Sequence, residues 1–123
     1  MISLSPDFLM LLLKKYEMPN LLIMVTDHEG NMIACSSEAV KLQKLKAAKY
    51  IIESGSASVL DLTGIPGMET VGASFGVISF GTPVMAGDEI YGSVIATGQQ
   101  DIVSMLCNTV RASIESVIEY ENI

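Results

Sequence analysis

A β-hairpin that leads directly into a long helix is predicted for residues 83–120, and it constrains the fold more than any other part of the chain. Gly87 lies in the turn between the two strands, and an amphipathic helix follows from Gln99. Thr97 and Gln100 have the spacing of a capping box, in which Thr97 accepts the Gln100 backbone N–H and the glutamine reaches back. Because this unit carries no catalytic motif, it favours a sensory or regulatory module over an enzyme.

The length and composition of the chain indicate one folded domain over residues 1–123. Hydrophobic residues make up 50% of the sequence and charged residues 17%, which excludes a disordered segment. The apolar cluster at residues 8–13 is too short to span a membrane, and Asp7 just before it argues against a signal peptide. We therefore expect a cytoplasmic protein without membrane contact. Cys35 and Cys107 lack metal-ligand spacing and are expected to be structural thiols.

The net charge of −7 at pH 7 argues against direct contact of this domain with nucleic acid. The charge is unevenly distributed, because six of the seven basic residues precede residue 50 and only Arg111 follows it. The densest basic group consists of Lys41, Lys44, Lys46 and Lys49. These lysines either solvate one face of a helix or include one or two that contact an anionic ligand, for which Lys44 and Lys49 are best placed.

The first helix is predicted to begin with Ser5 as its N-cap and to run to about Tyr16 or Glu17. Its residues 8–13 leave almost no polar face, so the helix must be covered on more than one side. In a domain this small, we expect a second subunit to supply part of that cover, which predicts a homodimer. The side chains assigned to the dimer interface are Phe8, Leu9, Leu12 and Leu13.

Two strands, at residues 21–26 and 32–36, are predicted to pair around a turn in which Gly30 supplies a positive φ. His28 lies in that turn, and since no partner for catalysis or metal binding can be assigned to it, we expect an exposed turn residue. Further strands are predicted at 58–62, at 74–85 with a break near residues 81–83, and at 89–96, with a loop over 63–72.

The second helix is predicted to be capped by Ser36 or Ser37, to continue through Glu53 and to end at Gly55. The last helix carries two apolar stripes, which indicates one face for the sheet and a second for a partner helix. The first stripe consists of Val103, Leu106, Val110, Val117 and Tyr120, and the flanking one of Ile102, Ile114 and Ile118.

The predicted order of elements is α-β-β-α-β-β-β-α. Hairpins dominate this order, and no strand–helix unit carries the glycine-rich fingerprint of a nucleotide-binding loop. The sequence therefore predicts an α+β fold, an antiparallel sheet with helices packed on it in the manner of PAS, GAF and profilin domains.

The motif Pro83–Gly98 resembles the strand–turn–strand of the sugar-diacid recognition domain of bacterial carbohydrate-diacid transcriptional regulators, which closes in Gly-(aliphatic)-Thr-Gly before a helix. Residues 20–36 are similar to the first hairpin of that family, and residues 47–55 to the end of its second helix. The family usually has a histidine just before the small pair that corresponds to Ala47-Ala48, and this chain has none there. The GAF-like domain of AbrB-type sporulation regulators is the nearest alternative.

The resemblance implies a ligand-sensing domain of a bacterial transcription regulator, with a DNA-binding output domain either fused to it or separate. A carboxylate ligand needs cationic or backbone N–H donors, which the sequence offers at three places: Ser36-Ser37, Lys44 with Lys49, and Thr97-Gly98. Hydroxyls such as those of Ser79 and Thr82 could contact a polyol. The same serines and threonines also suit ordinary caps and strand positions.

Neither a nucleophile–base pair, nor paired carboxylates, nor a metal-binding cluster can be picked out of the sequence. We therefore expect no enzyme activity, no catalytic residue, no metal and no cofactor. Two functions stay open: a small-molecule-sensing domain for a carboxylate or sugar acid, and a dimerisation or interaction module of the same fold that binds no ligand.

Overall fold

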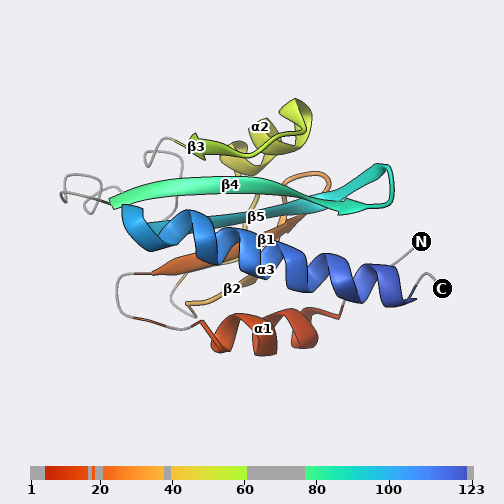
Figure 1. Cartoon of the computed structure of the whole chain (residues 1–123), viewed down its shortest axis with the longest axis horizontal. Coiled ribbons are helices and arrows are strands. Elements are labelled where there is room, and N and C mark those ends of the chain that lie inside the picture. Colours follow the sequence, from red (N-terminus) through yellow and green to blue (C-terminus); the bar gives the residue numbers. More distant parts are fainter. Residues whose placement is uncertain (1–4, 17, 19–20, 38–39, 61–76, 122–123) are drawn as a thin grey trace.

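The computed structural model describes residues 5–16, 18, 21–37, 40–60 and 77–121. It has the α+β architecture and the order of elements that the sequence predicts (Figure 1). The elements are α1 (Pro6–Lys14), β1 (Leu22–Asp27), β2 (Met32–Cys35), α2 (Lys46–Ser54), β3 (Ser58–Leu60), β4 (Val77–Ala86), β5 (Glu89–Gln99) and α3 (Gln100–Glu121).

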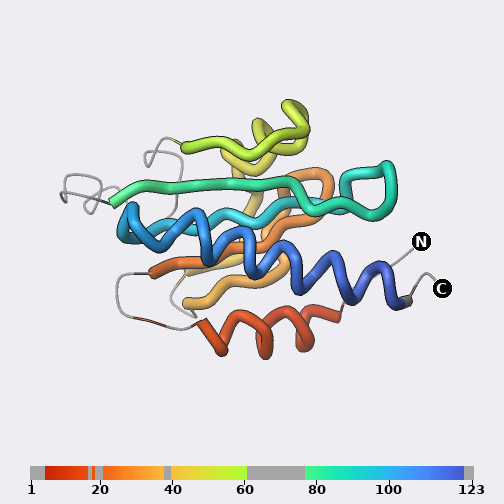
Figure 2. Tube along the Cα trace, viewed as in Figure 1, coloured from red at the N-terminus to blue at the C-terminus, as the bar shows by residue number. Residues whose placement is uncertain are grey.

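The five strands form one antiparallel sheet in the order β2-β1-β5-β4-β3. Two tight turns join neighbouring strands, with Gly30 at φ 87° after β1, as predicted, and Gly87 at φ 65° after β4. Asp27 braces the first turn, since its Oδ1 accepts the backbone N–H groups of Glu29 and Asn31. The long strand β5 lies in the middle of the sheet, between β1 and β4 (Figure 2).

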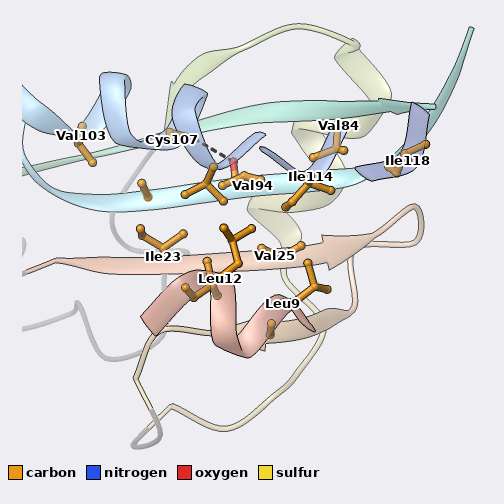
Figure 3. Close-up of a cluster of buried hydrophobic side chains, with 14 residues drawn as sticks. Leu9, Leu12, Ile23, Val25, Val84, Val94, Val103, Cys107, Ile114 and Ile118 are labelled. Carbon is orange, nitrogen blue, oxygen red and sulfur yellow. Dashed lines mark hydrogen bonds between the residues drawn. The ribbon is translucent and has the colours of Figure 1, made fainter. Parts of the chain in front are cut away.

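Helices α1 and α3 cover one face of the sheet (Figure 1). The close-up in Figure 3 shows side chains from both helices meeting Ile23 and Val25 of β1 and Val94 of β5. The buried members of this core, named here the α3-side core, are Leu9, Leu12, Leu13, Ile23, Val25, Ala34, Val84, Val94, Ala96, Val103, Cys107, Val110, Ile114 and Ile118. This face of the sheet is therefore filled by the chain's own helices.

The packing of α1 corrects the reason for assigning its apolar side chains to a dimer interface. Leu9 and Leu13 are fully buried and Leu12 is 8% exposed within the single chain, and Phe8 packs against the same core. Helix α1 lies on the same face of the sheet as α3, so the sheet and α3 together cover these four side chains. In the apolar run, only Leu11 is widely exposed, at 66%.

Helix α2 covers the opposite face, named here the α2 face. Its apolar contacts form a second, smaller core of Leu22, Met24, Met32, Cys35, Leu45, Ala48 and Ile95. The approach is close at Gly81 of β4, where an added Cβ would lie 2.8 Å from Cγ1 of Ile51. Gly55 follows the last residue of this helix, as predicted, and has a left-handed conformation with φ 69°.

Helix α2 begins later than predicted. Its first residue is Lys46, the cap position is Leu45, and no side chain caps it. Ser36 instead extends the pairing of the first hairpin, because its Oγ accepts the Ile23 backbone N–H at 2.9 Å. Long-range backbone bonds hold the chain before α2 in a non-helical form, from Met32 N–H to the Gln43 carbonyl and from Leu45 N–H to the Gly30 carbonyl.

The start of α3 also differs from the prediction. Thr97 does not cap it, since β5 continues to Gln99 and pairs there with Val77 of β4. The buried stripe of α3 merges the two predicted stripes and includes Cys107, whereas Tyr120 is 78% exposed. Strand β4 runs on through residues 81–83 and shifts register only at 84/85. Pro83 fits there because β3 pairs only with residues 79–81, which leaves the outer edge of β4 open at the proline.

The predicted loop at 63–72 and the first residues of the strand predicted from 74 lie outside the described residues. Among the residues that the structure does describe, no helix is both long and apolar enough to cross a membrane.

Candidate functional site

Two buried hydroxyl groups face each other on the α2 face of the sheet. Ser79 on β4 is paired with Thr97 on β5, and their hydroxyl oxygens lie 2.9 Å apart. Ser79 is fully buried and Thr97 is 1% exposed. Their hydrogen bond uses one of the two hydroxyl protons. Within the described part of the chain, neither side chain forms another hydrogen bond. The second proton is therefore a donor to which a bound molecule could offer an acceptor.

A second hydroxyl pair lies on the same face, between Thr26 of β1 and Ser93 of β5, with 2.7 Å between the oxygens. Thr26 also donates to the Asp27 carbonyl at 3.1 Å, so Ser93 is the donor within the pair and both protons have acceptors. This pair completes its own hydrogen bonding, and it therefore has a structural role. Neither Thr26 nor Ser93 was predicted as a functional residue, although a polar residue at the end of an apolar strand was the available signal.

The surface between the two pairs is apolar. Met24 of β1 and Ile95 of β5 lie on it, both fully buried, and Leu60 of β3 packs against them. The Ser79–Thr97 pair, with this apolar surface beside it, is named here the hydroxyl site. It lies toward the end of the sheet where Leu22 pairs with Thr97, and the Thr26–Ser93 pair lies toward the other end.

The lysines that the sequence singled out lie at the far end from the hydroxyl site. Lys44 forms an isolated β-bridge with Asn31, and the Lys49 Cβ lies 3.7 Å from where a Cβ on Gly30 would be. Both lysines are exposed. Thr26 lies toward the lysine end of the sheet, and Leu22 lies level with the hydroxyl site, four residues away along β1. At about 3.3 Å per residue, these two levels are about 13 Å apart.

The remaining predicted ligand contacts do not join the hydroxyl site. Thr82 is 4% exposed, but it pairs with Val94 of the α3-side core and therefore faces α3, with its hydroxyl donating to the Pro83 carbonyl at 3.4 Å. Gly98 pairs with Ile78 in the β4–β5 ladder. Ser36 is occupied by the Ile23 backbone, and Ser37 follows it at the end of β2. Of the eight predicted residues, Ser79 and Thr97 are the two that the fold brings together.

The two cysteines are poor nucleophiles in this fold. Burial raises the pKa of the Cys107 thiol to about 12, and the thiol donates to the Val94 carbonyl at 3.3 Å (Figure 3). Burial also raises the pKa of Cys35. The described residues contain no cluster of three or more histidine, cysteine, aspartate or glutamate side chains that could hold a metal ion.

The outer side of α3 carries a shallow, open groove lined by Met105, Asn108, Thr109, Ala112, Ser113 and Ser116. Polar groups in this groove bond to the helix itself, since Asn108, Thr109 and Ser113 each donate to the carbonyl four residues earlier. Arg111 and Glu115 beside the groove form an ion pair with each other. The groove therefore bears no net charge and few unsatisfied polar groups.

Comparison with solved structures identifies the fold. The N-terminal part of E. coli DhaR, in its complex with DhaL, matches with a TM-score of 0.65 at 9% identity, over 95% of this chain and 50% of the DhaR chain. The cofactor-binding GAF domain of the nutrient sensor CodY from Clostridium difficile matches with a TM-score of 0.57 at 12% identity, over 93% of this chain and 84% of that one. The GAF domain of A. aeolicus nlh2 matches with a TM-score of 0.54 at 12% identity, over 96% and 82%.

These likenesses show a GAF-like fold, and this chain spans half the length of the DhaR chain. No protein-family model matches the sequence, and no curated protein matches it either.

Proposed function

We propose that this chain is the small-molecule-sensing domain of a transcription regulator and that its ligand binds at the hydroxyl site. The observation that carries the proposal is the buried Ser79–Thr97 pair, which holds a spare donor on an otherwise apolar surface. Few precisely placed polar groups in an apolar lining are typical of small-molecule sites. The GAF-like fold supports the proposal, since the CodY domain of that fold binds a cofactor in a nutrient sensor.

The two faces of the sheet differ in how many buried side chains cover them. On one face the long helix α3 and helix α1 bury a core of fourteen side chains, and a ligand there would have to displace them. On the other face α2 has only nine residues, and its core has seven buried members. Ligand binding is therefore less costly on the α2 face, which is where the hydroxyl site lies.

The role we propose is binding without chemistry. Among the described residues, no histidine, lysine or carboxylate side chain bonds to Ser79 or Thr97. None of these residues therefore activates either hydroxyl as a nucleophile. We further propose that the regulator is bacterial and cytoplasmic, acts as a homodimer, and works through a DNA-binding domain that is fused to this one or separate.

The resemblance to sugar-diacid recognition domains supplies one hypothesis for the ligand, a sugar acid or other small carboxylate held by Lys44 or Lys49. Such a ligand would have to reach across about 13 Å of the sheet to contact the hydroxyl site as well. A long dicarboxylate could do so, whereas a short carboxylate could contact only one end.

A thermal-denaturation screen tests the proposed function. A ligand at a hundred times its Kd adds about 2.7 kcal/mol to the free energy of unfolding, which raises the Tm measurably. We expect at least one compound in a panel of sugars, polyols, hydroxy acids and amides to raise the Tm of the wild-type chain and to have no effect on the variant that lacks both hydroxyls, Ser79→Ala with Thr97→Val. An equal rise in wild type and variant would place the ligand elsewhere.

A second candidate function, a dimerisation module that binds no ligand, is favoured by the groove on α3. Two copies of this chain repel each other, because each has a net charge of −7. The repulsion is weakest where the surfaces in contact carry no net charge, as in the α3 groove. Small side chains such as Ala112 and Ser113 would let two helices approach closely there. This candidate predicts a dimer whose formation no small molecule affects.

A further inference from the structure

The charge of the ligand follows from where the basic side chains lie. All seven lysine and arginine residues belong to the described part of the chain. Lys14 and Lys15 end α1 on the opposite side of the sheet, and Arg111 lies on α3 and pairs with Glu115. The other four, Lys41, Lys44, Lys46 and Lys49, are exposed in the segment before α2 and on α2 itself.

None of these seven basic side chains bonds to Ser79 or Thr97. The sequence between Tyr50 and Arg111 contains no lysine, arginine or histidine, and this stretch includes β3, β4 and β5. His28, the single histidine, is in the exposed turn after β1, where it pairs with Glu29. The first turn of α3, which follows Thr97 in sequence, carries the acidic side chain of Asp101. The carboxylate of Asp101 thus already offsets the positive end of the α3 helix dipole.

Burying a carboxylate without a paired cation is strongly unfavourable, because the charge loses its hydration and gains only neutral donors. The hydroxyl site offers one spare hydroxyl proton, on a surface otherwise formed by Met24, Ile95 and Leu60. The net charge of −7 adds repulsion at longer range. A neutral oxygen loses much less hydration on burial and is not repelled at long range, and the spare hydroxyl proton can satisfy it as an acceptor.

We infer that the ligand of the hydroxyl site is an uncharged small molecule, with a carbonyl or hydroxyl oxygen for Ser79 and Thr97 and an apolar part for the surface beside them. This inference rests on the proposed function and narrows it, because it favours amides, alcohols and other neutral compounds with an apolar part over carboxylates. It also makes Lys44 and Lys49 dispensable for binding at this site.

The test compares neutral compounds with their acid counterparts: lactamide with lactate, and isobutyramide with isobutyrate, each at millimolar concentration. Binding is measured on the whole chain by the shift in Tm and by saturation-transfer NMR, which reports direct contact between the compound and the protein. Four proteins are compared: wild type, Ser79→Ala, Thr97→Val, and the double variant Lys44→Ala with Lys49→Ala. Either hydroxyl variant suffices if the other fails to fold.

We expect a neutral compound to bind wild type, to lose at least ten-fold in affinity in a hydroxyl variant, and to bind the double lysine variant as it binds wild type. If only the acids bind, and the lysine variant abolishes that binding, the inference is wrong; a sensing role then stands, but with its ligand at the lysines and not at the hydroxyl site. If no compound of either kind binds wild type, the proposed function fails, and the inference fails with it.

Discussion

The carboxylate of Glu115 on α3 accepts the backbone N–H of Met85 on β4 at 2.8 Å. This bond forms where the register of β4 against β5 shifts, between Val84 and Met85. Such a shift interrupts the regular ladder, and Glu115 supplies an acceptor at that point. The other oxygen of the same carboxylate bonds to Arg111, one helical turn earlier.

Replacement of Glu115 by alanine should lower the free energy of unfolding by about 1.5 to 3 kcal/mol, the usual contribution of a hydrogen bond to a charged group. The variant leaves the Met85 N–H, which is partly buried, without this acceptor. Glu119→Ala is the matched control, since Glu119 is exposed on the same helix. Urea denaturation of both variants measures the difference, and equal midpoints would show that the bond contributes nothing.

The hydroxyl pair predicts a non-additive mutant cycle. Thr97→Val alone leaves the buried Ser79 hydroxyl without its partner and should cost about 1 to 3 kcal/mol, and Ser79→Ala alone should have a similar effect. The double variant removes both polar groups and should cost clearly less than the sum of the two single changes. Denaturant midpoints of all four proteins give the coupling energy, and strict additivity would mean that the two hydroxyls do not interact.

Cys107 predicts a loss of stability at alkaline pH. Burial raises the pKa of its thiol to about 12, above that of an exposed thiol, so its contribution is complete below about pH 8.5 and is lost as the pH rises toward 12. Within that window the unfolded chain releases the proton first, and the free energy of unfolding falls by about 1.4 kcal/mol per pH unit. Cys107→Ala should lack this component. If its pH profile above pH 9 parallels that of wild type, the thiol does not titrate as its burial implies.

Cross-linking tests the groove on α3 as a self-association surface. Both natural cysteines are buried, so Ala112→Cys introduces the one exposed thiol. If two copies pack α3 against α3 around Ala112, mild oxidation should give a covalent dimer. Asp88→Cys, at the exposed tip of the β4–β5 hairpin, is the control and should not cross-link.

A charged side chain introduced into the groove tests in a second way whether two copies associate through it. Ala112→Glu should convert a dimer to a monomer in light scattering, whereas Gln43→Glu, which adds the same charge at an exposed position beside α2, should not. Equal cross-linking of both cysteine variants, or a wild-type mass of one chain at tens of micromolar, would exclude this surface.

Local chemistry accounts for the parts of the fold that the sequence predicted well. The Ser5 hydroxyl accepts the N–H groups of Asp7 and Phe8 at the start of α1, and Gly30 in the turn after β1 has the expected positive φ. Each of these features depends on residues within a few positions of one another, which a single sequence displays directly.

Long-range pairing accounts for the parts that were wrong. Thr97 has the spacing of a helix cap, but pairing of β5 with Leu22 on one side and Ser79 on the other keeps it in the sheet. Ser36 looks like the cap of α2, but the Ile23 backbone occupies its hydroxyl. Ser79 and Thr97 were both proposed as ligand contacts, yet their adjacency depends on the register between β4 and β5, which the spacing of residues in the sequence does not specify.

The most direct test of the proposed sensing role is the location of ligand-induced changes in a two-dimensional ¹H–¹⁵N NMR spectrum of the whole chain. The compound that raises the Tm most is titrated into wild type. The account predicts that the largest shifts cluster on the α2 face, at Ser79, Gly81, Ile95 and Thr97, and disappear in the Ser79→Ala/Thr97→Val variant. Shifts confined to the groove residues of α3, or to Lys44 and Lys49, would contradict it.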